Sequence, residues 1–167
     1  HATASFGQGI ALSPMAITRA FATLANGGVL IRPYVVSEIK YASGLSNKTK
    51  VKIDGRAISR ESSEKITQML IKTVDSALGG GKYKMDRYSV AAKTGTAQIS
   101  NPEGGGYYDD RFLHSFFGYY PAYNPEFIVF IYLTEPKDVR YASETLSEPF
   151  FNLAEFLLNY YEVPPDR

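Results

Sequence analysis

The stretch Ala91-Ala92-Lys93-Thr94-Gly95-Thr96-Ala97-Gln98 places an ammonium group and two hydroxyl groups side by side in the chain. We predict a strand over 88–99, and because side chains alternate between the faces of a strand, Thr94 and Thr96 should share a face. The glycine between them lets another backbone approach closely. Hydroxyls beside an ammonium group suit a carboxylate ligand. A solvated lysine on an ordinary strand explains the same stretch equally well.

Two strongly apolar segments follow and supply partners for this strand. We expect a polar, glycine-rich loop at 100–111, then strands at about 113–120 and 126–134. The run from Phe127 to Leu133 has no polar alternation, so both of its faces should be covered.

Helical periodicity marks two segments before the lysine strand. Ser13 is suited to cap a helix over 14–26, which Asn26-Gly27-Gly28 would end. Ser59 is suited to cap a second helix over 60–78, stopped by Gly79-Gly80-Gly81. Its expected apolar face comprises Ile66, Met69, Leu70, Thr73, Val74 and Ala77. Between the helices, β-branched and aromatic residues over 29–42 predict a hairpin through 43–47 into 49–53.

The last apolar segment predicts a third helix at about 147–161, beginning at Ser147-Glu148-Pro149. Because it is apolar nearly all round, it should lie buried on the sheet. Together the elements predict an α+β fold in which helices flank an antiparallel sheet.

Composition narrows the function classes. The 167 residues suit one domain, and a net charge of +1 offers no basic surface for nucleic acid. Without cysteine there is no disulfide or thiolate metal site, and two histidines make a histidine-based metal site improbable. We expect no cofactor. The longest apolar run, Phe127 to Leu133, is too short to span a bilayer.

Lys93-Thr94-Gly95-Thr96 resembles the third motif of penicillin-binding proteins and serine β-lactamases, whose full set is Ser-x-x-Lys, Ser-x-Asn and Lys-Thr-Gly. The resemblance to class B penicillin-binding proteins covers about residues 5–135 in collinear segments. These are Ser5-Phe6-Gly7-Gln8-Gly9-Ile10, Ser13-Pro14, Ala22-Thr23-Leu24-Ala25-Asn26-Gly27-Gly28, Ser115-Phe116-Phe117-Gly118-Tyr119-Tyr120-Pro121-Ala122 and Asn124-Pro125. The tail departs, because Pro149-Phe150 lacks the family's small-residue stretch before it.

The resemblance implies a serine-type peptidoglycan D,D-transpeptidase. In that reaction a serine attacks the penultimate carbonyl of a D-Ala-D-Ala stem peptide, D-Ala leaves, and an amine resolves the acyl-enzyme. Lys93, Thr94, Gly95 and Thr96 would bind the substrate. Lys93 would also act on the second-motif serine, and the Thr96 backbone N–H would be an oxyanion donor. β-Lactams would inhibit the enzyme.

The first two motifs of the set are not where the family needs them. No Ser-x-Asn occurs, and neither Ser-x-x-Lys match is suitable. Ser37 and Lys40 lie in an alternating segment, on opposite faces. Ser62 and Lys65 share a helical face, but they lie 31 positions before Lys93, whereas the family's nucleophile is far upstream. We interpret them as a solvated face.

The chain is therefore expected to be the C-terminal portion of one transpeptidase domain, over 1–167, with the serine motifs on an upstream segment. The missing strands would pair beside 126–134, so one edge of that strand should be unpaired or filled by another chain. The resemblance also implies an extracytoplasmic protein of cell-wall synthesis, held at the membrane by a segment outside this chain.

Other features have weaker interpretations. Ala77-Leu78-Gly79-Gly80-Gly81-Lys82-Tyr83 does not match a phosphate-binding loop and indicates a helix stop. His114 is expected to be a packed strand residue rather than a cleft residue. A mobile lid and a plain hairpin loop explain 100–111 equally well. For the whole protein, a carboxypeptidase or β-lactamase of the same fold and a non-catalytic wall-peptide or penicillin sensor remain the alternatives.

Overall fold

The computed structural model describes residues 7–167. His1, and Ser5 and Phe6 of the first family-like segment, lie outside the described residues.

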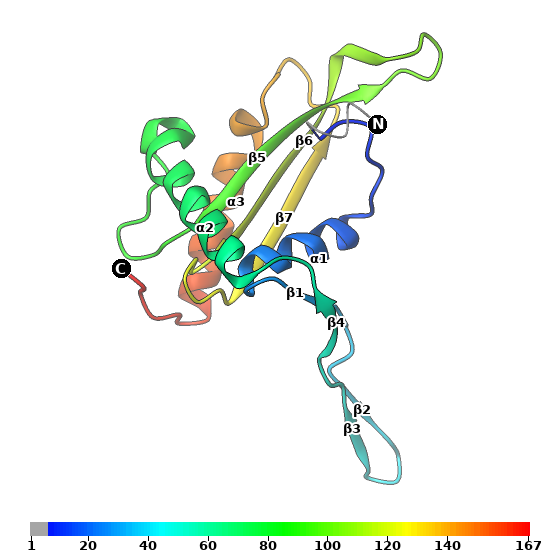
Figure 1. Cartoon of the computed structure of the whole chain (residues 1–167), viewed down its shortest axis with the longest axis vertical. Helices are drawn as coiled ribbons and strands as arrows, with labels where there is room; N and C mark the ends of the chain where they lie inside the picture. The colour runs from blue at the N-terminus through cyan, green and yellow to red at the C-terminus, as the bar shows by residue number, and fades with distance from the viewer. Residues whose placement is uncertain (1–6) are drawn as a thin grey trace.

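A three-stranded antiparallel sheet forms the centre of the molecule (Figure 1). Its strands are β5 (Ala91–Ser100), β6 (Tyr107–Tyr120) and β7 (Phe127–Thr134), in the order β5-β6-β7. The middle strand is the most buried, with Phe116, Tyr119 and Tyr120 fully enclosed. The predicted α+β fold with an antiparallel sheet is confirmed.

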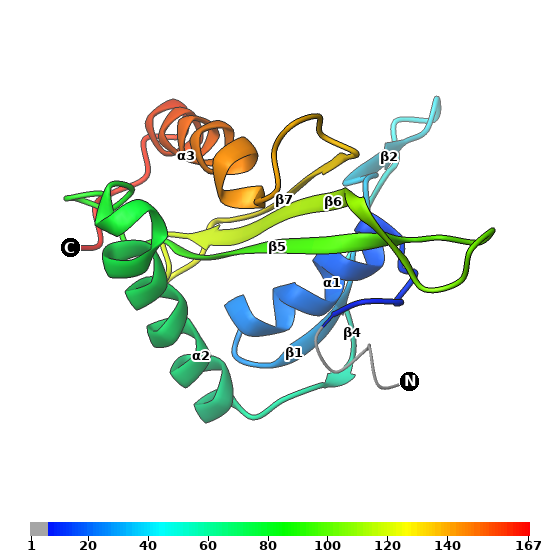
Figure 2. The same ribbon diagram turned by 90° about the horizontal axis from the view of Figure 1, so that it is seen from above.

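Helices cover both faces of this sheet (Figure 2). On one face lie α1 (Pro14–Ala25) and α2 (Arg60–Lys72), and on the other lies α3 (Ala142–Tyr160). Successive residues of β6 point alternately toward α3 and toward the layer of α1 and α2, as the two-residue period of a strand requires. Phe116 stacks on Phe150 of α3, with ring centroids 4.4 Å apart, and Phe117 stacks on Phe21 of α1 at 4.2 Å.

Close approach between α3 and the sheet depends on Gly118. A Cβ atom added there would lie 2.5 Å from Cζ of Phe150 and 2.8 Å from Cβ of Ala92. The absent side chain therefore lets Phe150 pack directly on the strands. Burying a phenylalanine of this kind contributes roughly 2–3 kcal/mol.

The first two helices begin where the sequence predicts. Ser13 Oγ accepts from the Ala16 N–H at 3.2 Å, and Ser59 Oγ accepts from the Ser62 N–H at 3.0 Å. The regular part of α2 ends earlier than predicted, however. It passes into a π-helical turn, η2 (Thr73–Ala77), and a 3₁₀ turn, η3 (Leu78–Gly81). Gly79 and Gly80 have φ of 55° and 66°, so the predicted glycine stop is confirmed.

The buried face of this segment agrees only in part with the predicted apolar face: Val74, in η2, is fully buried as predicted, but the buried residues of α2 itself are others. Its buried residues are Ser63, Thr67 and Ile71, whereas Met69 is 66% exposed. The Ser63 hydroxyl donates to the Leu24 carbonyl at 2.6 Å, and Thr67 Oγ1 lies 2.6 Å from the Tyr119 hydroxyl. Small hydroxyl side chains can therefore line a helix interface when each finds a hydrogen-bond partner.

The prediction for α3 was wrong at its start and about its burial. The helix begins at Ala142, because the Tyr141 N–H donates to Glu144 Oε2 at 3.2 Å in a capping arrangement. Pro149 lies inside the helix. Phe150 and Leu158 are buried, but Phe156 is 59% exposed and stacks on Tyr160 along the outer face.

An arm, residues 29–56, projects from the body (Figure 1). Near the body, β1 (Val29–Arg32) pairs with β4 (Lys52–Arg56), and farther out β2 (Glu38–Lys40) pairs with β3 (Ser46–Lys48). The hairpin turn lies within the predicted region, with the Tyr41 N–H donating to the Leu45 carbonyl at 2.9 Å.

The apolar strand β7 confirms one expectation and contradicts another. Among residues 7–167 it pairs only with β6, so its other edge is unpaired as predicted. Coverage of both faces is incomplete, because Tyr132 and Leu133 are 52% and 42% exposed. The described helices do not cover this end of the strand.

The loop between β5 and β6 is shorter than predicted. β6 already begins at Tyr107, so residues 107–111 are strand rather than loop. Only 101–106 connect the two strands, and a strand register that extends to Ser100 opposite Tyr107 accounts for the difference.

The residues after α3 return to the body. The Asp166 carboxylate accepts from the Ser89 N–H at 2.6 Å and from the Ser89 hydroxyl. Arg167 donates to Asp75 at 2.6 Å. In the described part of the chain, no helix is both long and apolar enough to cross a bilayer.

Candidate functional site

The four residues of the Lys-Thr-Gly-Thr motif lie on β5, at an edge of the sheet. Within residues 7–167, β5 pairs on one side only, with β6. Directly opposite residues in an antiparallel pair share a face. Thr94 is opposite Phe116 and Thr96 is opposite His114. Both β6 residues contact α3, so the two threonines share the α3 face, as predicted.

Lys93 occupies the other face of β5. It is opposite Phe117, whose ring stacks on α1. The ammonium group donates to the Thr94 carbonyl at 2.8 Å and is exposed. The lysine and the two hydroxyls, which are adjacent in the sequence, therefore lie on opposite faces of the strand. The three groups meet only around the open edge of the strand, because adjacent residues alternate.

Packing against the neighbouring strand explains why residue 95 is a glycine, which the sequence did not reveal. A Cβ atom at this position would lie 2.6 Å from Ser115 Oγ on the neighbouring strand. The same serine donates to the Gly95 carbonyl at 3.4 Å. Gly95 thus leaves room for the Ser115 hydroxyl on the neighbouring strand.

The Thr96 hydroxyl is already oriented by α3. Its oxygen accepts from the Ala142 N–H, the first residue of α3, at 3.0 Å. Since this bond occupies a lone pair, the hydroxyl proton remains to be donated elsewhere. Hydrogen bonds in a chain strengthen one another, so Thr96 is a good donor for an acceptor at the sheet edge.

A small apolar cavity of about 230 Å³ lies beside Lys93 on the α1 and α2 face. Its walls include Phe21, Leu24, Ile66, Leu70, Phe117 and Phe130. Lys93, Gly95 and Ser115 form its polar margin. No pattern in the sequence indicates this cavity, because its lining comes from five elements that are separated in the chain.

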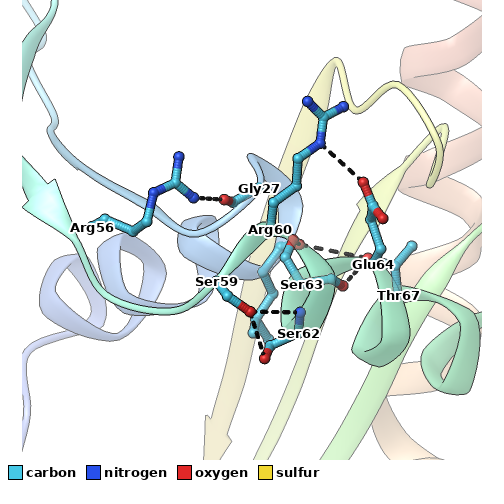
Figure 3. A network of polar contacts seen from close by, with 9 residues as sticks. Gly27, Arg56, Ser59, Arg60, Ser62, Ser63, Glu64 and Thr67 are labelled. Atoms are coloured by element: carbon cyan, nitrogen blue, oxygen red, sulfur yellow. Dashed lines mark hydrogen bonds and ion pairs between the residues drawn. The ribbon is translucent and has the colours of Figure 1, made fainter.

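The Ser62 and Lys65 pair does not form a nucleophile and base. Figure 3 shows Ser62 bonded to Ser59 at the start of α2, where the hydroxyls are 2.9 Å apart. Lys65 donates instead to Glu61 at 2.6 Å, and both Ser62 and Lys65 are exposed. The interpretation as a solvated helix face is confirmed.

The other serine match, Ser37 and Lys40, lies on the arm. Lys40 forms an ion pair with Glu38 at 3.6 Å. His114 is a packed strand residue, as expected, and is fully buried. No group of His, Cys, Asp and Glu suited to a metal occurs in the part of the chain that the structure describes.

A larger cavity of about 570 Å³ lies between the end of α1, α2 and the loop at 122–125. The guanidinium groups at its rim are already bonded, Arg56 to the Gly27 carbonyl and Arg60 to Glu64 at 2.9 Å (Figure 3). It shares only Leu24 with the cavity beside Lys93. It is therefore separate from the motif on β5.

Comparison with known families now assigns the fold. The family model described as "Penicillin binding protein transpeptidase domain" matches residues 1–154. This chain belongs to that family. The predicted resemblance to class B penicillin-binding proteins is confirmed by the match together with the relatives below.

Individual relatives agree with the family. The chain is 34% identical to the probable peptidoglycan D,D-transpeptidase PenA of Neisseria meningitidis, covering 100% of this chain and 27% of that protein. It is 31% identical to stage V sporulation protein D of Bacillus subtilis, covering 89% and 23%. The chain thus spans between 23% and 39% of the length of such curated relatives.

Solved structures show the same fold. Penicillin-binding protein 3 of Mycobacterium tuberculosis superposes with a TM-score of 0.82 at 27% identity, covering 96% of this chain and 38% of that one. The same protein has been solved in complex with ampicillin, where the TM-score is 0.81 at 28% identity, covering 95% and 37%. The β-lactam complex belongs to that protein.

Proposed function

We propose that this chain supplies the substrate-binding strand of a serine-type peptidoglycan D,D-transpeptidase. The observation that carries the proposal is the Lys93-Thr94-Gly95-Thr96 motif on a strand whose outer edge is open among residues 7–167. A D-Ala-D-Ala stem peptide is extended and ends in a carboxylate. An open strand edge can accept such a peptide as an additional strand.

The motif residues suit two tasks in that reaction, binding the terminal carboxylate of the substrate and stabilising the oxyanion. The Thr94 and Thr96 hydroxyls would donate to the terminal carboxylate, with the Lys93 ammonium providing charge around the strand edge. By the family resemblance, the backbone N–H of Thr96 is one donor to the oxyanion. Lys93 would act electrostatically on the serine of the second motif.

The serine itself would come from an upstream segment that carries Ser-x-x-Lys and Ser-x-Asn. Its Oγ attacks the penultimate D-Ala carbonyl, the amide C–N bond breaks, and D-Ala leaves with a proton. An amine of a neighbouring stem peptide then attacks the ester and releases the serine. The unpaired edge of β7 and the cavity beside Lys93 support docking of that segment. Residues 1–167 would be the C-terminal portion of the domain.

The family also suggests where the protein acts. We propose an extracytoplasmic location in cell-wall synthesis, with a membrane anchor outside this chain and β-lactams as inhibitors. The relatives include stage V sporulation protein D of Bacillus subtilis, so a role in sporulation is consistent with this proposal.

Intact mass after incubation with benzylpenicillin tests the function. The chain alone should gain no adduct, and the protein with its upstream segment should gain one penicilloyl group on that segment. Lys93→Met should slow the acylation by a factor on the order of 100. Lys65→Met, which removes an exposed lysine of α2, is the matched control and should leave the rate unchanged.

Three results would contradict the proposal in different ways. An adduct on Ser62 would assign the nucleophile to this chain. Absence of any adduct would favour a non-catalytic binding module. An acylated protein that releases D-Ala from a stem peptide without forming cross-links would indicate a carboxypeptidase.

A further inference from the structure

His114 connects the middle of the sheet to the start of α3. Its side chain is fully buried, and both ring nitrogens have partners. Nε2 lies 2.9 Å from the Arg140 carbonyl oxygen, and Nδ1 lies 2.9 Å from Thr145 Oγ1. One imidazole thus contacts the residues on both sides of the first residue of the helix.

The chemistry of the partners fixes the direction of these bonds. A carbonyl oxygen only accepts, so Nε2 must carry a proton and donate to Arg140. In the neutral ring Nδ1 is then the acceptor. The Thr145 hydroxyl donates to it at 2.9 Å in preference to the Ala142 carbonyl, which lies farther away at 3.4 Å. Both nitrogens are satisfied without a charge, which suits a group that is completely buried.

The segment that His114 holds is the one that orients Thr96. Arg140 precedes and Thr145 follows Ala142, whose N–H donates to Thr96 Oγ1 at 3.0 Å. Thr96 is also directly opposite His114 in the strand register. The His114 imidazole therefore contacts the same segment, residues 140–145, whose Ala142 N–H donates to the Thr96 hydroxyl.

The loop that leads into α3 needs such an anchor. Glu135 and Asp138 have φ of 51° and 59°, a region that non-glycine residues seldom adopt. The first end of the loop is tied to the sheet by the Glu135 N–H, which donates to the Phe112 carbonyl at 2.9 Å. His114 supplies the corresponding attachment at the second end, through Arg140.

We propose that His114 is a positioning residue for Thr96, an inference that rests on the proposed function. It holds the start of α3 so that the Ala142 N–H occupies the lone pair of Thr96 Oγ1 and directs the Thr96 O–H toward the substrate carboxylate. His114 itself does not contact the substrate or exchange a proton with it.

Two conservative variants separate the two nitrogens. His114→Gln places an amide N–H near the position of Nε2 and keeps the donor to Arg140. His114→Asn places its amide near Nδ1 and loses that donor. Thr145→Val removes the partner of Nδ1 without changing the histidine, so the inference can still be tested if a histidine variant does not fold.

Amide hydrogen exchange at Ala142, in the protein with its upstream segment, gives the first readout. We expect exchange at least tenfold faster in His114→Asn and Thr145→Val, and a rate within about threefold of the original protein in His114→Gln. Unchanged exchange in both His114→Asn and Thr145→Val would overturn the inference. Loss of protection at every amide of α3 in His114→Gln as well would also overturn it, because His114 would then serve general stability.

Acylation by benzylpenicillin gives the second readout. His114→Asn should lower the second-order rate constant about tenfold, as expected for the loss of one well-oriented charge-assisted hydrogen bond. The double variant His114→Asn with Thr96→Val should be acylated as fast as Thr96→Val alone, because both changes remove the same hydrogen bond. Leu158→Val, a change at a buried position near the other end of α3, is the matched control and should combine with Thr96→Val multiplicatively. Multiplicative losses for His114→Asn would contradict a role through Thr96.

The two readouts distinguish the inference from the function on which it rests. If the original protein is not acylated at all, the proposed function fails. The exchange of Ala142 still decides whether His114 fixes the contact between α3 and Thr96. If acylation occurs but His114→Asn reacts at the original rate, the function stands and the positioning role is wrong.

Discussion

The arm and the central sheet are both made of antiparallel strands, yet they are stabilised differently. No residue between 32 and 56 is buried, and Val35 of the arm is 93% exposed. On β6, Phe116 is fully buried between neighbouring strands and α3. The two regions carry similar β-branched and aromatic residues. A strand-forming pattern therefore specifies extended backbone, whereas burial depends on a layer that covers it.

The contacts that hold each region reflect this difference. Asp54 joins β4 to the body by pairing with Arg19 of α1, and it also pairs with Arg32 of β1 at 2.7 Å. Exposed ion pairs of this kind contribute little. The sheet is held by packed aromatic rings such as Phe116 and Phe150. Opening of the arm should therefore be easier than opening of the sheet.

The largest expected effect on stability comes from removing the aromatic ring of Phe150 between α3 and the central sheet. Phe150→Ala should lower the free energy of unfolding by about 3–5 kcal/mol, because it leaves a cavity between α3 and β6. Val35→Ala on the arm is the control and should change it by less than about 0.5 kcal/mol. Urea denaturation measures both. Comparable losses would mean that the arm is packed in solution.

Glycine substitutions separate packing from backbone conformation. Gly118→Ala should cost about 1–3 kcal/mol through overlap with Phe150 and Ala92. Gly44→Ala in the arm meets no atom within 4 Å but has φ of 84°, so it should cost about 1 kcal/mol through strain. Thermal or urea unfolding gives both values.

A second substituent checks the two causes. Gly44→Asn should recover much of the loss, since asparagine tolerates the left-handed region. Gly118→Asn should be worse than Gly118→Ala, because the space is the limiting factor. The opposite ranking at either site would show that the cause has been assigned wrongly.

Tyrosine hydroxyls give a smaller contrast. Burial raises the pKa of both Tyr119 and Tyr120, so both stay protonated. Tyr119→Phe should cost about 1 kcal/mol, since it loses the contact with Thr67. Tyr120→Phe should cost nothing or stabilise slightly, because its buried hydroxyl has no partner among the described residues.

The arm provides the matched control for these hydroxyls. Tyr41 is 52% exposed, and water can satisfy its hydroxyl, so Tyr41→Phe should leave the urea midpoint unchanged. A loss at Tyr120→Phe as large as at Tyr119→Phe would show that Tyr120 has a partner in solution.

Removing the charge of Asp54 should have a local effect. In Asp54→Asn the pairs with Arg19 and Arg32 are lost, and the amides of Ile31 and Ile53 should exchange faster. Amides of β6 should keep their protection, and the urea midpoint should stay nearly constant. Glu61→Gln, which breaks the exposed pair with Lys65, is the control and should leave the arm unchanged. Faster exchange throughout β6 would show that the arm and the sheet open together.

The smallest effect is a pH dependence confined to the arm. The hydrogen bond from Arg32, partly opposed by desolvation, lowers the pKa of Asp54 below its ordinary value of 3.8. Its contribution is therefore fully present above the pKa of the unfolded chain and is lost as pH falls through the lower folded value. Exchange at Ile31 and Ile53 should rise below pH 3.8 in the original protein. The same comparison in Asp54→Asn should show no such rise.

The sequence by itself determined the features that depend on residues close together in the chain. Ser13 and Ser59 predicted two helix starts, because a cap and the N–H groups it accepts from lie within one turn. The two-residue period of a strand placed Thr94 and Thr96 on one face. The Lys-Thr-Gly-Thr motif and its neighbouring segments predicted the family, because each of them is a run of residues close together in the chain.

Only the tertiary structure decided the contacts between distant residues. The Glu144 carboxylate accepts from the Tyr141 N–H, so α3 begins at Ala142 and not at the predicted Ser147. That start then placed an N–H against Thr96, which is 46 positions away. Ser63 and Thr67 became core residues because the Leu24 carbonyl and the Tyr119 hydroxyl were there to bond them. A periodic pattern records what each residue prefers locally, whereas these partners exist only after the layers have packed.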